Sequence, residues 1–324
     1  MRKTLSILLA GLSIFTFTAC SSTTNTSANT NSANTETTAK PAKTITIGLL
    51  PDTDSVPFVI ADKQGYFKEA GVEVKIEQFK SAKDRDSAFQ AGKLDAVITD
   101  VLAVAFAKEG GFDVKITSKT DGNYKLLVGK DSGINSVNDI KGKSIAISKN
   151  TLIEYATDKL LEAAGYSSED VKKEVVPQIP TRLEMLQNGK IDSATLPEPM
   201  ASLAMKNGAK LIDETVKHEM NPGVLAFSTK SINESSKEIK AVYTAYNKAV
   251  QYINGTPVSN YVDLLIKELG FPEAIKDSIV LPEYKEAEMS REKDVTNVLA
   301  WMKSKELIKG SYEFKDLIDD QFVR

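Results

Sequence analysis

The stretches QAGKLDAVITD (Gln90 to Asp100) and QNGKIDSATLPEP (Gln187 to Pro199) repeat one pattern. In both, Gln, Gly, Lys, an aliphatic residue and Asp stand at the same offsets, and an acid follows the apolar run. Because Gly-Lys before such a run is a natural turn into a strand, the phrase alone could arise by convergence. A duplicated fold requires the likeness to extend into the flanking residues.

The likeness does extend along the chain. Residues 44–50 and 143–148 are short apolar runs with β-branched residues, which predict strands. A polar turn follows each, and then a helical pattern that ends in Ala-Gly, at 56–71 in the first copy and at 152–165 in the second. Strands that alternate with helices predict parallel sheets with crossover helices. The sequence therefore predicts an α/β fold with two lobes, each a mostly parallel sheet flanked by helices.

Two strand-like segments flank the second copy of the repeat, at 123–130 and 222–230. They predict a two-strand hinge between the lobes. Lobe one is then expected to comprise residues 44–126 plus 228–324, and lobe two residues 127–227. Apolar residues recur at three- and four-residue spacing toward the C-terminus, which predicts helices. These helices are assigned to lobe one.

The N-terminal residues have the character of an export signal. Residues 1–19 combine a positive start with an apolar run too short to span a bilayer, which predicts a signal peptide. Small residues before Cys20 resemble a bacterial lipobox, so we expect a lipid on this thiol; an ordinary signal with an incidental cysteine is the alternative. Residues 20–43 lack Val, Ile, Leu and aromatic residues, which predicts a disordered linker. The protein is expected to be lipid-anchored at the extracytoplasmic face of the cell membrane.

Composition excludes several function classes. The net charge of −3 without a basic stripe argues against nucleic-acid binding. His218 is the only histidine and Cys20 the only cysteine, so a His/Cys metal site cannot be built and no metal or cofactor is predicted. The Gly-Lys-Ser at residues 142–144 resembles the end of a phosphate-binding loop, but Val137 stands where that motif requires glycine. We therefore expect a binding protein and not an enzyme.

Polar residues follow the strands at their expected carboxyl ends in both copies. Ligands of open α/β sheets bind in the crevice at these ends. If the two lobes face each other, both sets of polar residues line one cleft. The predicted ligand-binding residues are Asp52, Thr53, Asp54, Ser55, Asp100, Ser148, Asn150, Thr151 and Glu198.

Each of these residues has a second interpretation, because polar side chains before a helix also cap its free N–H groups. For Asp100 the two interpretations stay open. Glu198 stands between two prolines that restrict its backbone, which favours a role in ligand contact. Arg85 and Arg182 occupy equivalent places five residues before Gln90 and Gln187, and surface placement is expected for both arginines.

The balance of charges at the predicted cleft bears on the ligand. Four acids, Asp52, Asp54, Asp100 and Glu198, outnumber the two arginines. They would repel a sulfonate or nitrate unless arginines and helix N-termini dominate. The sequence therefore favours a neutral or cationic nitrogen compound, such as a pyrimidine or an amine. A taurine-like zwitterion and a sulfonate or other small anion remain open.

A resemblance to a known family is carried by four segments: ADKQGYFKEAGVEV (61–74), QAGKLDAVITD (90–100), SVNDIKGKSIAIS (136–148) and LPEPMASLA (196–204). Together they resemble the substrate-binding proteins of ABC importers, in the branch for sulfonates, nitrate and thiamine precursors. The resemblance implies a monomeric protein of two lobes that close on one small molecule and deliver it to a membrane permease and its ATPase. The alternative of another class is an exported enzyme related to pyrimidine synthesis. The resemblance ties that chemistry to a cysteine-rich motif and several histidines, whereas this chain has one cysteine and one histidine.

Overall fold

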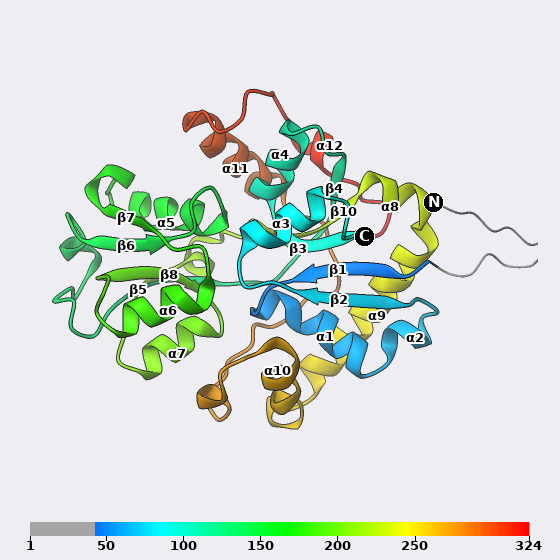
Figure 1. Ribbon diagram of the computed structural model, residues 1–324, viewed down its shortest axis with the longest axis horizontal. Helices are drawn as coiled ribbons and strands as arrows, with labels where there is room; N and C mark the ends of the chain where they lie inside the picture. The colour runs from blue at the N-terminus through cyan, green and yellow to red at the C-terminus, as the bar shows by residue number, and fades with distance from the viewer. Residues whose placement is uncertain (1–42, 324) are drawn as a thin grey trace, which may run out of the picture. The chain divides into compact units, whose positions relative to one another are not determined.

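The computed structural model describes residues 43–323. The predicted signal peptide, Cys20 and all of the linker except residue 43 lie outside the described residues. Within the described range, no helix is both long enough and apolar enough to cross a bilayer. The ten strands of this range form two five-stranded sheets (Figure 1).

The first sheet has the strand order β2-β1-β3-β10-β4. Strands β1, β2 and β3 are parallel, whereas β10 is antiparallel to its neighbours β3 and β4. The strand bounds are Ile45–Leu49 (β1), Val74–Gln78 (β2), Ala96–Asp100 (β3), Val114–Lys119 (β4) and Gly223–Ser228 (β10).

The second sheet repeats this topology in the order β7-β6-β8-β5-β9. Strands β6, β7 and β8 are parallel, and β5 is antiparallel to β8 and β9. The strand bounds are Tyr124–Val128 (β5), Ser144–Ile147 (β6), Lys172–Val175 (β7), Ser193–Pro197 (β8) and Lys210–Glu214 (β9). The predicted α/β fold with two similar lobes is confirmed.

Helices connect the parallel strands and cover both faces of each sheet (Figure 1). In the first half they are Val56–Lys63 (α1), Tyr66–Glu69 (α2), Ala82–Gln90 (α3) and Val101–Glu109 (α4). In the second they are Leu152–Ala163 (α5), Ile179–Gln187 (α6) and Met200–Lys206 (α7). The C-terminal helices are Thr229–Glu234 (α8), Ser236–Gly255 (α9), Val262–Leu269 (α10), Glu292–Ser304 (α11) and Phe314–Leu317 (α12). Short 3-10 turns span Thr53–Ser55, Val137–Asp139, Ser168–Asp170, Thr215–His218, Val258–Asn260 and Glu273–Ile275.

The helix predicted over residues 56–71 is broken in the structure. It forms α1 and α2, which are separated at Gly65. Gly65 has φ of 77°, in the left-handed region that glycine adopts without steric cost. The apolar pattern continues through the break because Phe67 remains buried, so periodicity alone does not reveal it.

The chain crosses between the lobes twice, and the strand after each crossing belongs to the sheet of the lobe that the chain has just entered. Strand β5 follows the first crossing and belongs wholly to the second sheet, whereas β10 follows the second crossing and belongs wholly to the first. The predicted boundaries after residues 126 and 227 therefore fall inside strands. We propose that the crossings are residues 120–123 and 215–222, so that each lobe keeps its sheet intact.

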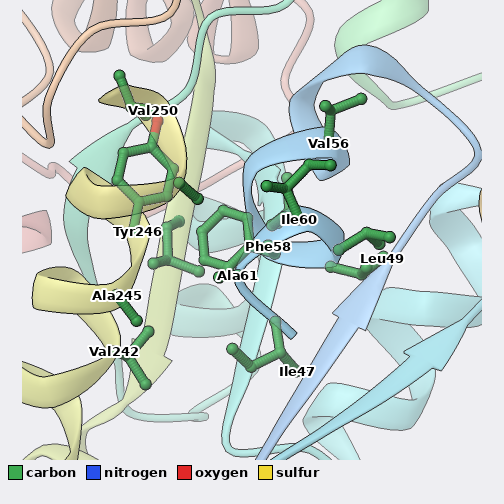
Figure 2. Close-up of a cluster of buried hydrophobic side chains, with 14 of the residues drawn as sticks. Ile47, Leu49, Val56, Phe58, Ile60, Ala61, Val242, Ala245, Tyr246 and Val250 are labelled. Carbon is green, nitrogen blue, oxygen red and sulfur yellow. The ribbon is translucent and has the colours of Figure 1, made fainter. Parts of the chain in front are cut away.

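A large apolar core anchors the start of α1 and with it the polar turn that precedes this helix. Figure 2 shows Phe58 of α1 beside Tyr246 of α9, with Ile47 of β1 nearby. The rings of Phe58 and Tyr246 lie 5.1 Å apart between centroids. Because such a core is close-packed, it holds residues 52–55 at the carboxyl end of β1.

The opposite face of the first sheet is covered by α4 and α11. Helix α11 also contacts the other lobe: the indole N–H of Trp301 donates to Asp158 Oδ2 of α5 at 3.1 Å. Lys305 forms an ion pair with the same carboxylate at 2.8 Å, and the ring of Tyr155 packs edge-on against Trp301. In this structure the lobes are therefore in contact away from the polar turns as well.

Candidate functional site

A cavity lies between the two lobes, at the carboxyl ends of their parallel strands. It encloses about 480 Å³ of space free of protein atoms, including its mouth. Its polar lining residues are Asp52, Asp54, Arg85, Thr99, Asp100, Tyr124, Ser148, Thr151 and Arg182. Its apolar lining residues are Leu50, Ala82, Ile98, Leu152, Ile153, Pro177, Ile179 and Pro197.

The turn after β1 contributes two carboxyl groups to the cavity, from Asp52 and Asp54, which are 6% and 5% exposed. Thr53 and Ser55, which were predicted as ligand contacts, do not line it. The backbone N–H of Thr53 donates to the Glu198 carbonyl of lobe two at 3.1 Å. The Ser55 hydroxyl donates to the Leu50 carbonyl and to Asp52 Oδ1. These two residues therefore hold the turn in place.

Asp54 lies against the first crossing between the lobes. Tyr124 donates its hydroxyl to Asp54 Oδ2 at 3.0 Å. A Cβ atom at Gly122 would come within 2.1 Å of this carboxylate, so only glycine allows the crossing to pass so close. Hydrogen bonds from the Thr120 hydroxyl and the Gly122 N–H also reach this buried carboxylate. The Asp54 side chain therefore lies between the cavity and the first crossing of the chain between the lobes.

Burial shifts the proton affinity of both carboxyl groups. Burial and the neighbouring Asp54 raise the pKa of Asp52 to about 8, although hydrogen bonds from Ser55 and the charge of Arg85 act in the other direction. Burial likewise raises the pKa of Asp54, with a further rise from Asp121. Burial at this end of the cavity therefore favours the protonated form of these carboxyl groups.

The equivalent turn in lobe two contributes Ser148 and Thr151, and the first residues of α5 follow them. Thr151 caps α5, because its hydroxyl oxygen accepts from the Ile153 N–H at 3.2 Å while donating to the Ser148 carbonyl at 2.8 Å. Asn150 was also predicted as a contact, but it does not line this cavity. It adopts a left-handed backbone with φ of 59°, and its N–H donates to Glu154.

Asp100 caps a helix and also lines the cavity, and its contact with a ligand stays a prediction. It caps α4, because its Oδ1 accepts from the Ala103 N–H at 2.9 Å, and it also lines the cavity. Burial and the charge of Asp86 raise the pKa of Asp100 to about 6, against hydrogen bonding that includes the Leu152 N–H of lobe two. The carboxylate therefore faces the N-terminus of α5 across the cleft.

Glu198 is placed behind the cavity wall and does not line the cavity. Its Oε2 accepts from the Ser202 N–H at 3.0 Å, and its Oε1 is paired with Lys125 at 2.5 Å. The preceding residue, Pro197, lines the cavity instead. Both oxygens of Glu198 are thus engaged within lobe two, and we assign this residue a capping and bracing role.

Arg85 is buried, contrary to the surface placement expected from sequence, with 3% exposure. Its guanidinium binds Asp86 Oδ1 at 2.8 Å and the Thr99 hydroxyl at 2.7 Å. Burial by itself would lower the pKa of Arg85, but the carboxylates around it, Asp86 first among them, raise it overall. The charge of Arg85 is therefore already matched inside lobe one.

Arg182 is also buried, with 1% exposure, and its surroundings are different. One terminal nitrogen donates to the carbonyls of Val176 and Pro177 at 2.9 and 3.0 Å, while Nε has no hydrogen-bond partner among the described residues. Burial lowers the pKa of Arg182 to about 10, and no carboxylate in the described part of the chain opposes this shift. A cation without a counter-ion therefore lines the cavity.

Both arginines were noticed in the repeat but placed at the surface. Their equivalent positions in the repeat could have indicated burial, because matching residues of two facing lobes lie at the same cleft. The signal for their different charge states was also present: Asp86 follows Arg85, whereas Leu183 follows Arg182. Among the described residues, no group of three or more His, Cys, Asp or Glu is arranged to hold a metal ion.

The chain was next compared with known proteins. The model of the family described as NMT1/THI5 like matches residues 52–260, which include every cavity residue except Leu50. The chain belongs to the NMT1/THI5-like family. A relative from Bacillus subtilis (strain 168), named "Putative aliphatic sulfonates-binding protein", is 28% identical over 220 residues. That match spans 65% of this chain and 65% of the relative.

Solved structures establish the fold of this family member. The alkanesulfonate-binding protein SsuA from Xanthomonas axonopodis pv. citri, solved with MOPS bound, superimposes with a TM-score of 0.74. At 17% identity, the match covers 87% of this chain and 99% of that protein. The desulfurization enzyme DszB has the same fold, with a TM-score of 0.66 at 13% identity over 86% of this chain and 97% of the enzyme. The fold therefore serves both binding and catalysis, and the function must be argued from the site.

Proposed function

We propose that this chain is an extracytoplasmic solute-binding lipoprotein of an ABC importer, and that it captures a small organic anion, such as a sulfonate, between its lobes. One observation carries the choice of an anion: Arg182 lines the cavity as a buried cation without a carboxylate partner among the described residues. This replaces the sequence-based preference for a neutral or cationic nitrogen compound, which rested on counting acids.

The physical argument concerns the cost of burying a charge. A guanidinium removed from water loses several kcal/mol of solvation unless an anion or several acceptors compensate. Two backbone carbonyls compensate Arg182 only in part, because its Nε remains without a partner. A planar guanidinium is well suited to two oxygens of one anionic group. A bound sulfonate or carboxylate would therefore complete this site.

The relatives support the same class of ligand. The names of the Bacillus subtilis relative and of the Xanthomonas protein both refer to sulfonate binding. The two-lobe fold suits capture, because a ligand that contacts both walls favours the closed arrangement of the lobes. Transfer to a permease and its ATPase, which the family resemblance implies, is the step that would follow capture.

Trp301 offers a direct test of capture and closure. It is the only tryptophan of the chain, and its indole N–H reaches Asp158 of the other lobe. We expect propane-1-sulfonate to change the fluorescence of Trp301 in a saturable way and to raise the melting temperature, since ligand at 100 times Kd stabilises the folded state by about 2.7 kcal/mol.

Calorimetry on the full-length protein, purified in detergent, supplies the affinity, and product analysis after long incubation tests for turnover. Saturable binding without product supports the proposal. Loss of the sulfonate group from the compound would establish an enzyme instead. The absence of binding by millimolar alkanesulfonates of several chain lengths would contradict the proposed ligand class.

Anchoring makes a separate prediction. If Cys20 carries the lipid, Cys20→Ser should move the protein from the membrane fraction into the periplasm or the medium, because a single-cysteine anchor has no substitute. Cell fractionation followed by immunoblotting measures this change. Ligand affinity should stay at the wild-type value, since residue 20 precedes the described lobes. A Cys20→Ser protein that remains in the membrane fraction would refute lipid anchoring through this residue.

A further inference from the structure

Helix α11 belongs to lobe one but makes a buried contact with lobe two. It packs beside α4 of the first sheet (Figure 1). The indole N–H of its Trp301 donates to Asp158 Oδ2 of α5 at 3.1 Å, and these two residues are 6% and 7% exposed. Lys305, which follows the helix, pairs with the same carboxylate oxygen at 2.8 Å. Because water is largely excluded here, the hydrogen bond to Asp158 is stronger than one at the surface.

An aromatic side chain of lobe two extends this contact. Tyr155 of α5 is 2% exposed and belongs to the buried apolar cluster that α4 and α11 form over the first sheet. Among the described residues, Tyr155 is the one buried member of this cluster that lobe two contributes. Its ring packs edge-on against Trp301, with 5.6 Å between the ring centroids. Separation of the lobes would therefore expose two aromatic rings to water, which is unfavourable.

Helix α5 joins this contact to the cavity. Leu152 and Ile153 at the start of α5 line the cavity. Tyr155 and Asp158 follow within the next two turns of the same helix. On the other wall, Asp100 lines the cavity and caps α4, the helix on which α11 packs. Because helices move as rigid units in hinge motions, moving α5 away from lobe one opens the cavity and also breaks the contact with α11.

We propose that Tyr155, Asp158 and Trp301 form a latch that holds the two lobes closed in part of the molecules before any ligand binds, and that the latch sets part of the ligand affinity. The statement on affinity rests on the proposed function, because it needs a ligand that contacts both walls. The three residues do not line the cavity, so they position its walls without touching the ligand. A contact that exists only in the closed form stabilises that form with or without ligand.

Trp301→Phe tests the latch with little disturbance of either lobe. Phenylalanine keeps a ring against Tyr155 but has no N–H to donate to Asp158. The carboxylate keeps its ion pair with Lys173 of its own lobe at 2.5 Å, so the substitution leaves no buried charge without a partner. Tyr155→Leu is the second variant, in case Trp301→Phe fails to fold. It keeps an apolar side chain in the cluster and removes the edge-on ring pair.

Spin labels across the mouth of the cleft measure closure without a ligand. Lys83 of lobe one and Lys149 of lobe two are exposed and line one groove beside the cavity. Lys83→Cys and Lys149→Cys together supply the labelling sites in the full-length protein. Each substitution alone measures any signal from Cys20, the only cysteine of the chain. Pulsed electron paramagnetic resonance then gives the ratio of closed molecules, with a short distance, to open molecules, with a long one.

The latch predicts a closed component in the wild-type protein without ligand. Trp301→Phe should lower the ratio of closed to open molecules by about ten- to a hundredfold, which corresponds to one hydrogen bond to a charged group. Tyr155→Leu should lower it by about two- to tenfold, the contribution of an aromatic pair. Calorimetry should show weaker binding of propane-1-sulfonate by up to the same factors, because the ligand must then supply the energy of closure.

Lys206→Met is the matched control at another contact between the lobes. The ammonium of Lys206 is exposed and donates to the Ala274 carbonyl of lobe one, where water competes for the bond. We expect this variant to change the ratio by less than about twofold. A wild-type protein without a closed component, a ratio unchanged by the latch variants, or an equal change in Lys206→Met would overturn the latch. A closed component that depends on the latch in a protein that binds no sulfonate would overturn the proposed function alone.

Discussion

Arg182→Met is expected to weaken the binding of propane-1-sulfonate by about 30-fold to more than a thousandfold. Truncating one partner of a buried, hydrogen-bonded charge pair costs about 2–5 kcal/mol, and each 1.4 kcal/mol is a factor of ten in affinity. Methionine keeps much of the apolar stem of arginine but removes the only cation of lobe two that lines the cavity in the described structure. Isothermal titration of both proteins measures the change.

The stability of the Arg182→Met protein serves as its control. Methionine loses the hydrogen bonds to the Val176 and Pro177 carbonyls, but it also removes a buried charge that no carboxylate in the described residues compensates. Because these effects oppose each other, we expect the melting temperature without ligand to stay close to that of the wild-type protein. Affinity near the wild-type value would remove Arg182 from the site, whatever the melting temperature does.

Arg85→Met, unlike Arg182→Met, is expected to lower stability. The free energy of unfolding should fall by about 3 kcal/mol. Arg85 is paired with Asp86, and loss of one partner leaves the other as an uncompensated charge, which costs about 3–5 kcal/mol for a fully buried pair. The Asp86 side chain keeps 17% exposure, so the lower end of that range applies. Urea unfolding monitored by circular dichroism measures the loss.

A surface ion pair provides the matched control for Arg85→Met. Lys75 and Glu77 form a pair at 2.7 Å in which the lysine side chain is 63% exposed. Lys75→Met should change the free energy of unfolding by less than about 1 kcal/mol, because water screens such pairs. Similar values for Lys75→Met and Arg85→Met would show that burial of the Arg85 pair does not matter for stability.

Local patterns were sufficient to predict the α/β architecture. The apolar strands, the Ala-Gly helix ends and the duplicated phrase all depend on residues close together in the chain. The same patterns did not reveal the break of α1 and α2 at Gly65, because the buried Phe67 continues the apolar periodicity. They also did not assign β5 and β10 to their sheets, since a strand pairs with distant residues and its own sequence does not name its partners.

The sequence predicted where the candidate site lies better than it predicted which residues line it. The carboxyl ends of parallel strands indicated the cleft, and five of the nine predicted residues line the cavity: Asp52, Asp54, Asp100, Ser148 and Thr151. Thr53, Ser55, Asn150 and Glu198 lie beside it and brace the turns and helices around it. A polar residue before a helix has the same sequence signature in either role, because capping and ligand contact use the same donors and acceptors.

The sequence by itself determined that two similar lobes would present polar turns to one cleft, because strand and helix patterns are properties of neighbouring residues. Only the tertiary structure decided which charges are compensated. Arg85 and Arg182 occupy equivalent places in the repeat, yet one is paired with a carboxylate and the other is bound to carbonyls alone. The difference depends on burial and on the groups that folding brings near each guanidinium, and these set the energy of a charge far more than its position in the chain.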